Sequence, residues 1–352
     1  MKPLIRRLCI AAGSLLGLGA VGFVGSYLAY SGQYVVPATT NDDPALPSRN
    51  IGGYRFHLEV QGLPTHPVVV ILHGGPGGDY RYLLPLKPLS DSYQLVFYDQ
   101  RGSGLSPRAP DAQLGLDQFV EDLSGVIASV SPHAPVRLIG HAWGAMLAAA
   151  FLDRHPDQVS HAVLAEPAFL TAERGNQWFE AVGHGKPPPS LQLLMGSWRA
   201  WIESLYVYGP DEEARGDFLR QELMGISLPG DPFAGYYCGA DPQTAHRPHW
   251  RHGARAFDAV MGKARDADGH FTVDLVSPHL ERYPHKVLLL AGSCNTIIGA
   301  EAQRQNMALF QNAELAVIED AGHTMFGEQP DASIAVLRRY LAEDHSAIVA
   351  SD

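Results

Sequence analysis

The stretch that decides the fold is VRLIGHAWGA, residues 136–145, in which an apolar run ends at a turn bounded by Gly140 and Gly144. Apolar residues with helical spacing continue from Ala145 to Arg154. The stretch therefore predicts a strand, a sharp turn and a helix in immediate succession. When the middle of such a Gly-x-x-x-Gly turn is serine, the turn holds the hydroxyl above the sheet and the glycines permit close packing. Here the middle residue is Ala142.

Outward from this turn, short apolar runs alternate with helical stretches. Most of these runs are continuously apolar, as expected for strands that helices cover on both faces, so the pattern predicts an α/β fold with a mostly parallel sheet. The expected helices are Leu116 to Val130, Ala145 to Arg154 and Asp331 to Glu343. The expected strands are Tyr54 to Val60, Val68 to Leu72, Gln94 to Tyr98, Val136 to Ile139, His161 to Ala165, Lys286 to Leu290 and Glu314 to Ile318.

Two further glycine-rich motifs follow expected strands. The first is HGGPGG, residues 73–78, where inward-pointing amides such as that of Gly75 could stabilise an oxyanion together with the amide of Trp143. A phosphate-binding loop is the alternative, but no Gly-Lys-Ser/Thr follows and the glycines do not fit the dinucleotide spacing. The second motif is DQRGSG, residues 99–104, which predicts a turn fixed by internal hydrogen bonds.

HGGPGG, DQRGSG and GHAWG, in this order, resemble the proline iminopeptidase family of α/β-hydrolases over about residues 54–164 and again over 286–330. The resemblance implies an eight-stranded sheet and an inserted helical cap. It further implies cleavage of an amide or ester through an acyl-enzyme without a cofactor. The substrate would be a small molecule or a short peptide with a free N-terminal proline or small apolar residue. Related enzymes also cleave esters and lactones, so the fold does not fix the substrate. No motif indicates a metal ion.

The resemblance also directs attention to a general base and its acid. His323 follows the last expected strand, where the base comes in the chain order nucleophile, acid, histidine. The usual acid position after Lys286 to Leu290 holds Asn295, which cannot stabilise an imidazolium by charge. Glu166 follows the preceding strand, where some other α/β-hydrolases place the acid, and we predict it as the partner of His323. Asn295 is then a neutral orienter of His323, and Asp320 is a third candidate.

Ala142 cannot attack a carbonyl, so the chain as written should lack ordinary serine-hydrolase turnover. The surrounding motifs are intact, which favours a recent loss of the hydroxyl, natural or engineered, from a hydrolase. One alternative is a ligand-binding relative without catalysis. Another is catalysis without a covalent step, in which His323 acts as a general base on water or on the substrate.

The first thirty residues differ from the rest of the chain. Lys2, Arg6 and Arg7 precede an uncharged run from Leu8 to Tyr30, whose 23 residues would span about 35 Å as a helix. We predict a membrane helix over residues 1–30, with the soluble part outside the cytoplasm. A cleaved secretory signal is the alternative. Residues 31–50 are expected to be a linker, 51–168 and 281–345 the hydrolase core, and 169–280 the cap.

Composition limits the remaining possibilities. The 352 residues carry a formal charge of −11, which opposes nucleic-acid binding. There are three cysteines, too few for a disulfide-stapled scaffold. Cys238 and Cys294 are the two in the globular part, and outside the cytoplasm they could form one disulfide between cap and core. Two unpaired buried thiols are the alternative.

Overall fold

The computed structural model describes residues 2–183, 189–226, 230–241, 248–277 and 280–343. The chain forms two compact units. One unit combines Pro37–Pro188 with Ser227–Asp352, and the other combines Met1–Val36 with Pro189–Ile226. Part of the segment predicted as the cap therefore groups with the N-terminal segment, and the remainder groups with the sheet.

The larger unit is built on one sheet in the order β1-β2-β4-β3-β5-β6-β7-β8, which confirms the predicted eight-stranded, mostly parallel architecture. β1 and β2 pair antiparallel, β2 pairs antiparallel with β4, and the strands from β4 to β8 are parallel. The strands are β1 (Ser48–Ile51), β2 (Tyr54–Gln61), β3 (Val68–Leu72), β4 (Gln94–Tyr98), β5 (Val136–His141), β6 (Val159–Ala165), β7 (Val287–Gly292) and β8 (Ala313–Ile318).

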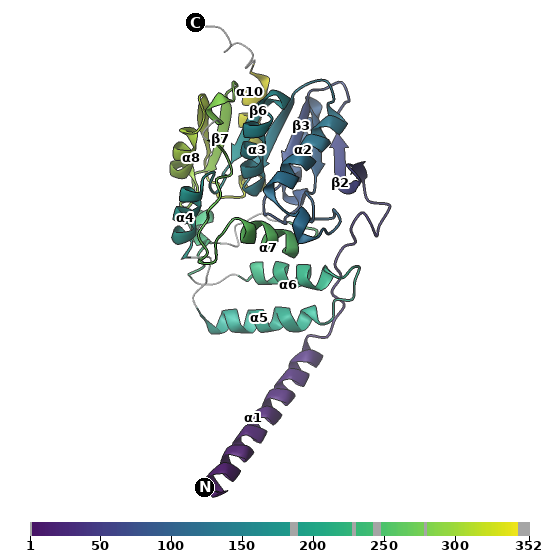
Figure 1. Ribbon diagram of the computed structural model, residues 1–352, viewed down its shortest axis with the longest axis vertical. Helices are drawn as coiled ribbons and strands as arrows, with labels where there is room; N and C mark the ends of the chain where they lie inside the picture. Colours follow the sequence, from purple (N-terminus) through teal and green to yellow (C-terminus); the bar gives the residue numbers. More distant parts are fainter. Residues whose placement is uncertain (1, 184–188, 227–229, 242–247, 278–279, 344–352) are drawn as a thin grey trace. The chain divides into compact units, whose positions relative to one another are not determined.

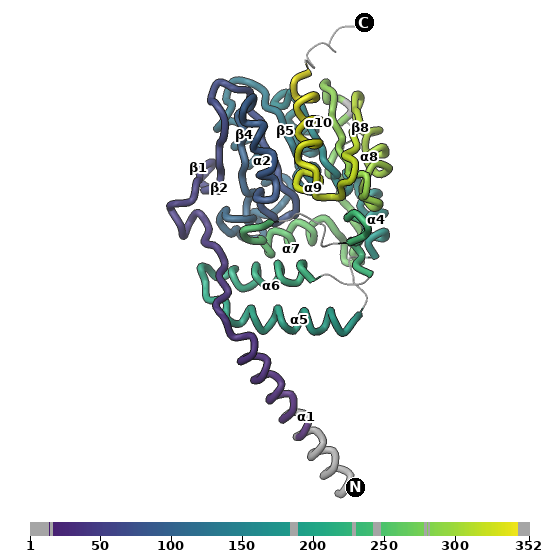
Figure 2. Tube along the Cα trace, turned by 180° about the vertical axis from the view of Figure 1, so that it is seen from behind, coloured from purple at the N-terminus to yellow at the C-terminus, as the bar shows by residue number. Residues whose placement is uncertain are grey.

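Helices cover both faces of this sheet, as its apolar strands require. Figure 1 shows α2 (Leu116–Val130) and α3 (Trp143–Arg154) in front of the sheet, and Figure 2 shows α10 (Pro330–Ala342) on the opposite face. The α2 and α3 side carries one buried apolar cluster, and the α10 side carries the other. The 3₁₀-helical segment η1 (Tyr80–Asp91) and α9 (Met325–Glu328) pack with α10, while α8 (Ala300–Met307) packs on β7 and β8.

The register of the parallel strands aligns their carboxyl ends. Leu72 lies opposite Gly140, His141 opposite Ala165, and Ala165 opposite Leu290. The loops that follow β3, β5, β6 and β7 therefore start at one edge of the sheet. This is the edge at which open α/β sheets bind ligands.

The structure departs from the predicted linker over residues 31–50. Its last residues form β1, and its middle is bound to the larger unit: the Thr40 amide donates to Leu105 O at 2.9 Å, and the Thr40 hydroxyl donates to Arg55 O at 2.6 Å. The Arg251 guanidinium, buried at 1% exposure, donates to Pro37 O at 3.0 Å. The proline-rich composition of this segment correctly predicts an irregular backbone. These contacts, however, hold that backbone against the larger unit, so it does not behave as a free linker.

The region predicted as a helical cap contains four α-helices within its described residues, α4 (Ala172–Ala181), α5 (Leu191–Ser204), α6 (Ala214–Met224) and α7 (Ala254–Lys263). At the N-terminus, α1 spans Lys2–Ala29. Within the described residues, no helix combines the length and the apolar character that a membrane crossing requires. The predicted membrane-spanning helix is thus not supported by the structure.

Candidate active site

The turn after β5 has the geometry of a nucleophile elbow although its central residue is alanine. Ala142 has φ 52° and ψ −118°, a conformation that costs an L-residue on the order of 1 to 3 kcal/mol. The flanking glycines are required by space. A Cβ on Gly140 would lie 2.4 Å from Gly144 O, and one on Gly144 would lie 2.2 Å from Leu72 O. The turn therefore places residue 142 between the end of β5 and the start of α3.

Two backbone amides beside this turn are available as oxyanion donors. Trp143 is the first residue of α3, where amides have no intrahelical acceptor. Gly75 lies in the HGGPGG loop with φ 134°. Neither amide donates a hydrogen bond within the described part of the chain. The loop lies against the elbow, because a Cβ on Gly74 would come within 3.1 Å of the Ala142 methyl.

The structure brings His323 and Glu166 together across 157 residues of sequence. His323 Nδ1 donates to Glu166 Oε2 at 2.6 Å. Glu166 follows β6 with a φ of 46° and is fully buried, while the His323 side chain is 18% exposed. The Gly292 amide donates to Glu166 Oε1 at 2.8 Å. The carboxylate therefore fixes the orientation of the imidazole and leaves Nε2 as its proton-accepting atom.

Burial raises the pKa of Glu166 well above its usual value, because the charged form loses its hydration. The hydrogen bonds from the Gly292 amide and Asn295 oppose this rise. Three donors, including His323 Nδ1, converge on two carboxylate oxygens. This donor set suits an ionised carboxylate that accepts a proton from none of them and stabilises a positive charge on His323.

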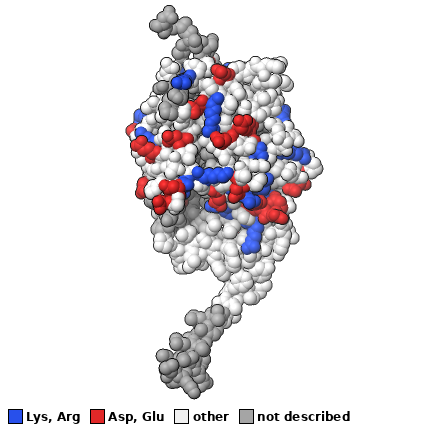
Figure 3. Space-filling view, in the orientation of Figure 1, with Lys and Arg blue, Asp and Glu red and all other residues white. Residues whose placement is uncertain are grey.

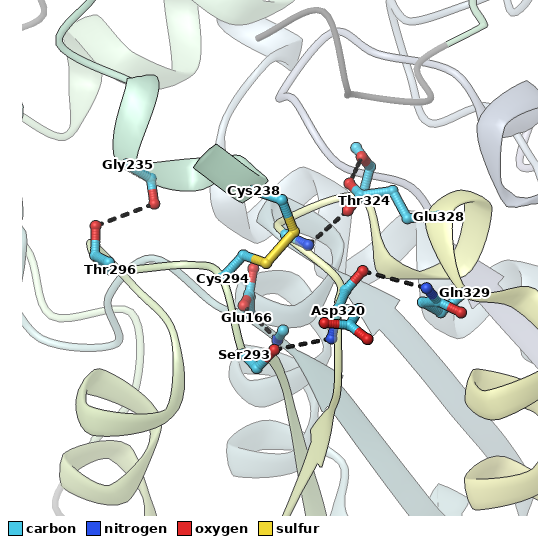
Figure 4. The surroundings of a disulfide bond; sticks show 12 residues. Glu166, Gly235, Cys238, Ser293, Cys294, Thr296, Asp320, Thr324, Glu328 and Gln329 are labelled. Carbon is cyan, nitrogen blue, oxygen red and sulfur yellow. Dashed lines mark hydrogen bonds between the residues drawn. A yellow bond between two sulfur atoms is a disulfide. The ribbon is translucent and has the colours of Figure 1, made fainter. Parts of the chain in front are cut away.

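The other two candidates for the acid have different positions. Asn295 donates through Nδ2 to Glu166 Oε2 at 2.7 Å, and its Oδ1 accepts from the amides of Ile297 and Ile298. It therefore orients Glu166, not His323 as predicted. Asp320 lies in the turn before His323 but is exposed. Its amide donates to Ser293 Oγ at 3.0 Å (Figure 4). In the described residues its carboxylate makes no hydrogen bond to His323, whose Nδ1 donates to Glu166.

The buried His141 connects the elbow to two other loops of the site. His141 Nε2 lies 2.7 Å from His323 O, which can only accept, so Nε2 carries the proton. His141 Nδ1 then accepts from the Tyr82 hydroxyl at 2.7 Å, and that hydroxyl accepts from the Gly74 amide at 2.7 Å. Burial lowers the pKa of His141 well below its usual value, with the nearby His323 adding to the effect. A neutral His141 thus holds the elbow, the HGGPGG loop and the His323 loop in one network.

Sequence reasoning missed two residues that hold the His323 loop. Glu328 accepts from the Gly322 amide at 2.6 Å and from the Thr324 hydroxyl. Tyr236 packs edge-on against the His323 ring with centroids 4.8 Å apart, and its carbonyl accepts from the His323 amide at 2.8 Å. In the sequence, the many aromatic residues between positions 169 and 280 are the one signal that includes Tyr236, and they do not distinguish it from the others.

A disulfide ties this part of the cap to the loop after β7 (Figure 4). Cys238 bonds to Cys294, so of the two alternatives that the sequence left open, the structure has the disulfide and not the free thiols. The Cys294 amide donates to Ala321 O, and the Thr296 amide donates to Gly235 O at 2.8 Å. The bridge therefore lies between the loop that carries Asn295 and the segment that carries Tyr236.

Comparison with known proteins agrees with the geometry. The family model described as the alpha/beta hydrolase fold matches residues 67–330, and the chain belongs to this family. It is 33% identical over 318 residues to a probable aminopeptidase, YbaC, of Bacillus subtilis (strain 168), over 83% of this chain and 94% of the relative. A proline iminopeptidase of Heyndrickxia coagulans is 39% identical over 100 residues, which are 28% of this chain and 34% of that protein's length. The resemblance drawn from the three motifs is confirmed.

Solved structures show the same fold. A proline iminopeptidase-related protein from Thermus thermophilus superposes with a TM-score of 0.58 and 22% identity, over 85% of this chain and 97% of that one. A membrane phospholipase A described as a bacterial virulence factor gives a TM-score of 0.57 and 18% identity, over 97% of this chain and 98% of that one. At these identities the likeness concerns the fold alone.

Proposed function

We propose that the site is that of a serine hydrolase that cleaves an amide or ester through an acyl-enzyme, with Ala142 in the place of the nucleophile. One observation carries the proposal: the buried Glu166 carboxylate binds His323 Nδ1 in a loop that contacts residue 141, next to the elbow. In the proposed reaction, His323 Nε2 takes the proton of a hydroxyl at position 142 and later gives it to the leaving group. The amides of Gly75 and Trp143 stabilise the oxyanion.

With alanine at position 142 this covalent route is closed, because a methyl group has no lone pair for attack. Binding and the oxyanion amides alone can still accelerate hydrolysis by about 10³ to 10⁴ over water. The missing hydroxyl favours a second candidate function, in which His323 acts as a general base on water or on a substrate C–H or O–H. A third candidate function is ligand binding by the same site without catalytic turnover.

The names of the relatives support a substrate class. The YbaC relative is named a probable aminopeptidase, and several others are named proline iminopeptidases. We therefore propose a short peptide or aminoacyl compound with a free N-terminal proline or small apolar residue.

The test restores the hydroxyl with Ala142→Ser. We expect a burst of product from proline or alanine p-nitroanilides or from p-nitrophenyl esters, together with an acyl adduct in intact-protein mass spectrometry. The parent chain should give neither. The double variant Ala142→Ser/His323→Gln is the matched control and should lose the burst while it keeps the hydroxyl. Turnover by the parent that Ala142→Ser does not increase would overturn the acyl-enzyme proposal in favour of a His323 general base.

We also propose that the globular part lies outside the cytoplasm and that the N-terminal segment is in contact with a membrane. The Cys238–Cys294 disulfide supports the location, because such bonds persist in oxidising compartments. The uncharged run after Lys2, Arg6 and Arg7 supports the membrane contact. Secretion after cleavage of this segment is the alternative.

A further inference from the structure

The exposed large apolar side chains are concentrated in the unit formed by Met1–Val36 and Pro189–Ile226. Within the described residues, all of them lie in this unit except Leu63 and Val273. Single exposed apolar residues are common on soluble proteins, whereas contiguous groups of them mark interaction sites. The grouping therefore calls for a partner with an apolar surface.

One face of α5 carries five side chains of this group. Its exposed apolar residues follow helical spacing, so they form one stripe along the helix. They are Leu191 (71% exposed), Leu194 (67%), Met195 (60%), Trp198 (41%) and Trp201 (38%). The nearby Arg199 pairs with Glu203 at 2.7 Å, and the Glu203 side chain is 4% exposed. The charge next to the stripe is thus neutralised by a buried partner.

The described part of α1 continues this face. Trp198 Nε1 donates to Ser26 Oγ at 3.1 Å, and Phe23 lies 6.0 Å from Trp201 between ring centroids. Tyr27 stacks on Tyr206 at 4.5 Å. Figure 3 shows the described part of α1 without a Lys, Arg, Asp or Glu side chain. Its exposed apolar residues are Leu18, Val21, Phe23, Val24 and Leu28.

We propose that the α5 stripe and the adjoining part of α1 rest on a lipid bilayer, with Trp198, Trp201 and Tyr206 at the level of the headgroups. Tryptophan and tyrosine concentrate at this boundary because their rings have an apolar body and a polar tip. An amphipathic helix at this position buries its apolar face about 5 to 10 Å deep. The inference rests on the proposed membrane contact of the N-terminal segment and adds a second, non-spanning contact from the cap region.

Continuity of the α5 stripe with the uncharged N-terminal run favours the bilayer over a second copy of the chain or another protein. The uncharged run that contacts α5 has Lys2, Arg6 and Arg7 at its far end, which are attracted to anionic headgroups.

The first test measures contact directly. The full chain is mixed with vesicles of phosphatidylcholine and phosphatidylglycerol that carry brominated acyl chains, which quench tryptophan on contact. We expect quenching in the parent and its loss in Trp198→Phe/Trp201→Phe. Trp143, Trp178 and Trp250 belong to the other unit and remain as an internal reference. Binding to vesicles without quenching overturns the α5 contact and leaves the N-terminal contact standing. No binding at all overturns both.

The second test measures affinity by vesicle flotation. Leu191→Gln/Leu194→Gln/Met195→Gln should weaken binding by at least about tenfold, since each side chain loses the free energy of apolar burial. The matched control is Leu63→Gln/Val273→Gln, which alters exposed apolar residues of the other unit and should change nothing. A dimer in light scattering that the triple variant dissociates would assign the face to a second copy and overturn the proposal. Hydrolysis of a soluble ester by the Ala142→Ser protein reports on the proposed function separately, and the triple variant should leave it unchanged.

Discussion

At the scale of single residues, Glu166 determines which nitrogen of His323 carries the proton. The Gly292 amide and the Asn295 side chain both donate to the carboxylate, and Asn295 cannot reverse its amide because Oδ1 accepts from two backbone amides. His323 Nδ1 also donates to it. A glutamine amide at this position has one oxygen for the three donors, so its NH₂ must face either the Gly292 amide or the Asn295 and His323 side chains.

Glu166→Gln should switch His323 to the other tautomer. When the NH₂ of glutamine takes the place of Glu166 Oε2, it donates to Nδ1, so the proton moves to Nε2 and the general base is lost. Nitrogen NMR of the imidazole should show Nδ1–H in the parent and Nε2–H in the variant. In the Ala142→Ser background the hydrolysis rate should fall by about 10⁴, the loss seen for the equivalent change in a serine-protease triad. Glu328→Gln is the control and should leave the tautomer unchanged; an unchanged tautomer in Glu166→Gln would contradict the assignment.

At the scale of elements, the disulfide holds the loop after β7 against the cap segment that contacts His323. It closes a loop with a sequence separation of 56 residues. In the chain-entropy account, a cross-link over such a loop lowers the entropy of the unfolded chain by an amount worth about 4 kcal/mol. The loop after β7 also contacts Glu166 through Asn295. The disulfide therefore affects both the stability of the fold and the geometry of the site.

Cys238→Ser/Cys294→Ser should therefore lower the free energy of unfolding by about 2 to 4 kcal/mol in denaturant titrations. Hydrogen exchange should accelerate first at the amides of Thr296 and His323, whose acceptors, Gly235 O and Tyr236 O, lie in the cap segment. Cys9→Ser removes a thiol outside the bridge and should leave both quantities unchanged. Equal acceleration across the whole sheet would show that the bridge stabilises the fold globally and does not hold the site in particular.

At the scale of the whole molecule, buried histidines should make the fold sensitive to acid. Burial lowers the pKa of both His73 and His141 below the usual value. Each ring has both nitrogens within hydrogen-bonding distance of a partner, and the Gln100 amide donates to His73 Nε2 at 3.0 Å. The unfolded chain takes up these protons near pH 6.5, whereas the folded chain does not.

The free energy of unfolding should thus fall as the pH falls below about 6.5, by up to about 1.4 kcal/mol per pH unit for each of the two histidines. Glu166 contributes with the opposite sign: its raised pKa favours the folded state at low pH, and this contribution is lost as the pH rises through the folded value. Denaturant titrations between pH 5 and 7 measure the slope. His141→Gln should reduce it, and the exposed His133→Gln should not. A slope that His141→Gln leaves unchanged would contradict the neutral state of His141.

The sequence by itself determined the alternation of strands and helices, the glycine turns at the strand ends and the family. These features depend on local patterns: apolar runs form β3 to β8 to within two residues of prediction, and Gly140 and Gly144 are needed wherever this turn occurs. The sequence pattern did not predict β1, because this strand is short and lies in a segment of loop-like composition.

Only the tertiary structure decided which carboxylate meets His323, which residues hold the loops, and whether the two cysteines pair. Glu166 and His323 follow different strands, and the register of β6, β7 and β8 sets their separation. His141, Tyr82 and Tyr236 acquire their partners across loops far apart in sequence. No local pattern encodes such contacts, because they arise when strand ends and the cap pack together around one edge of the sheet.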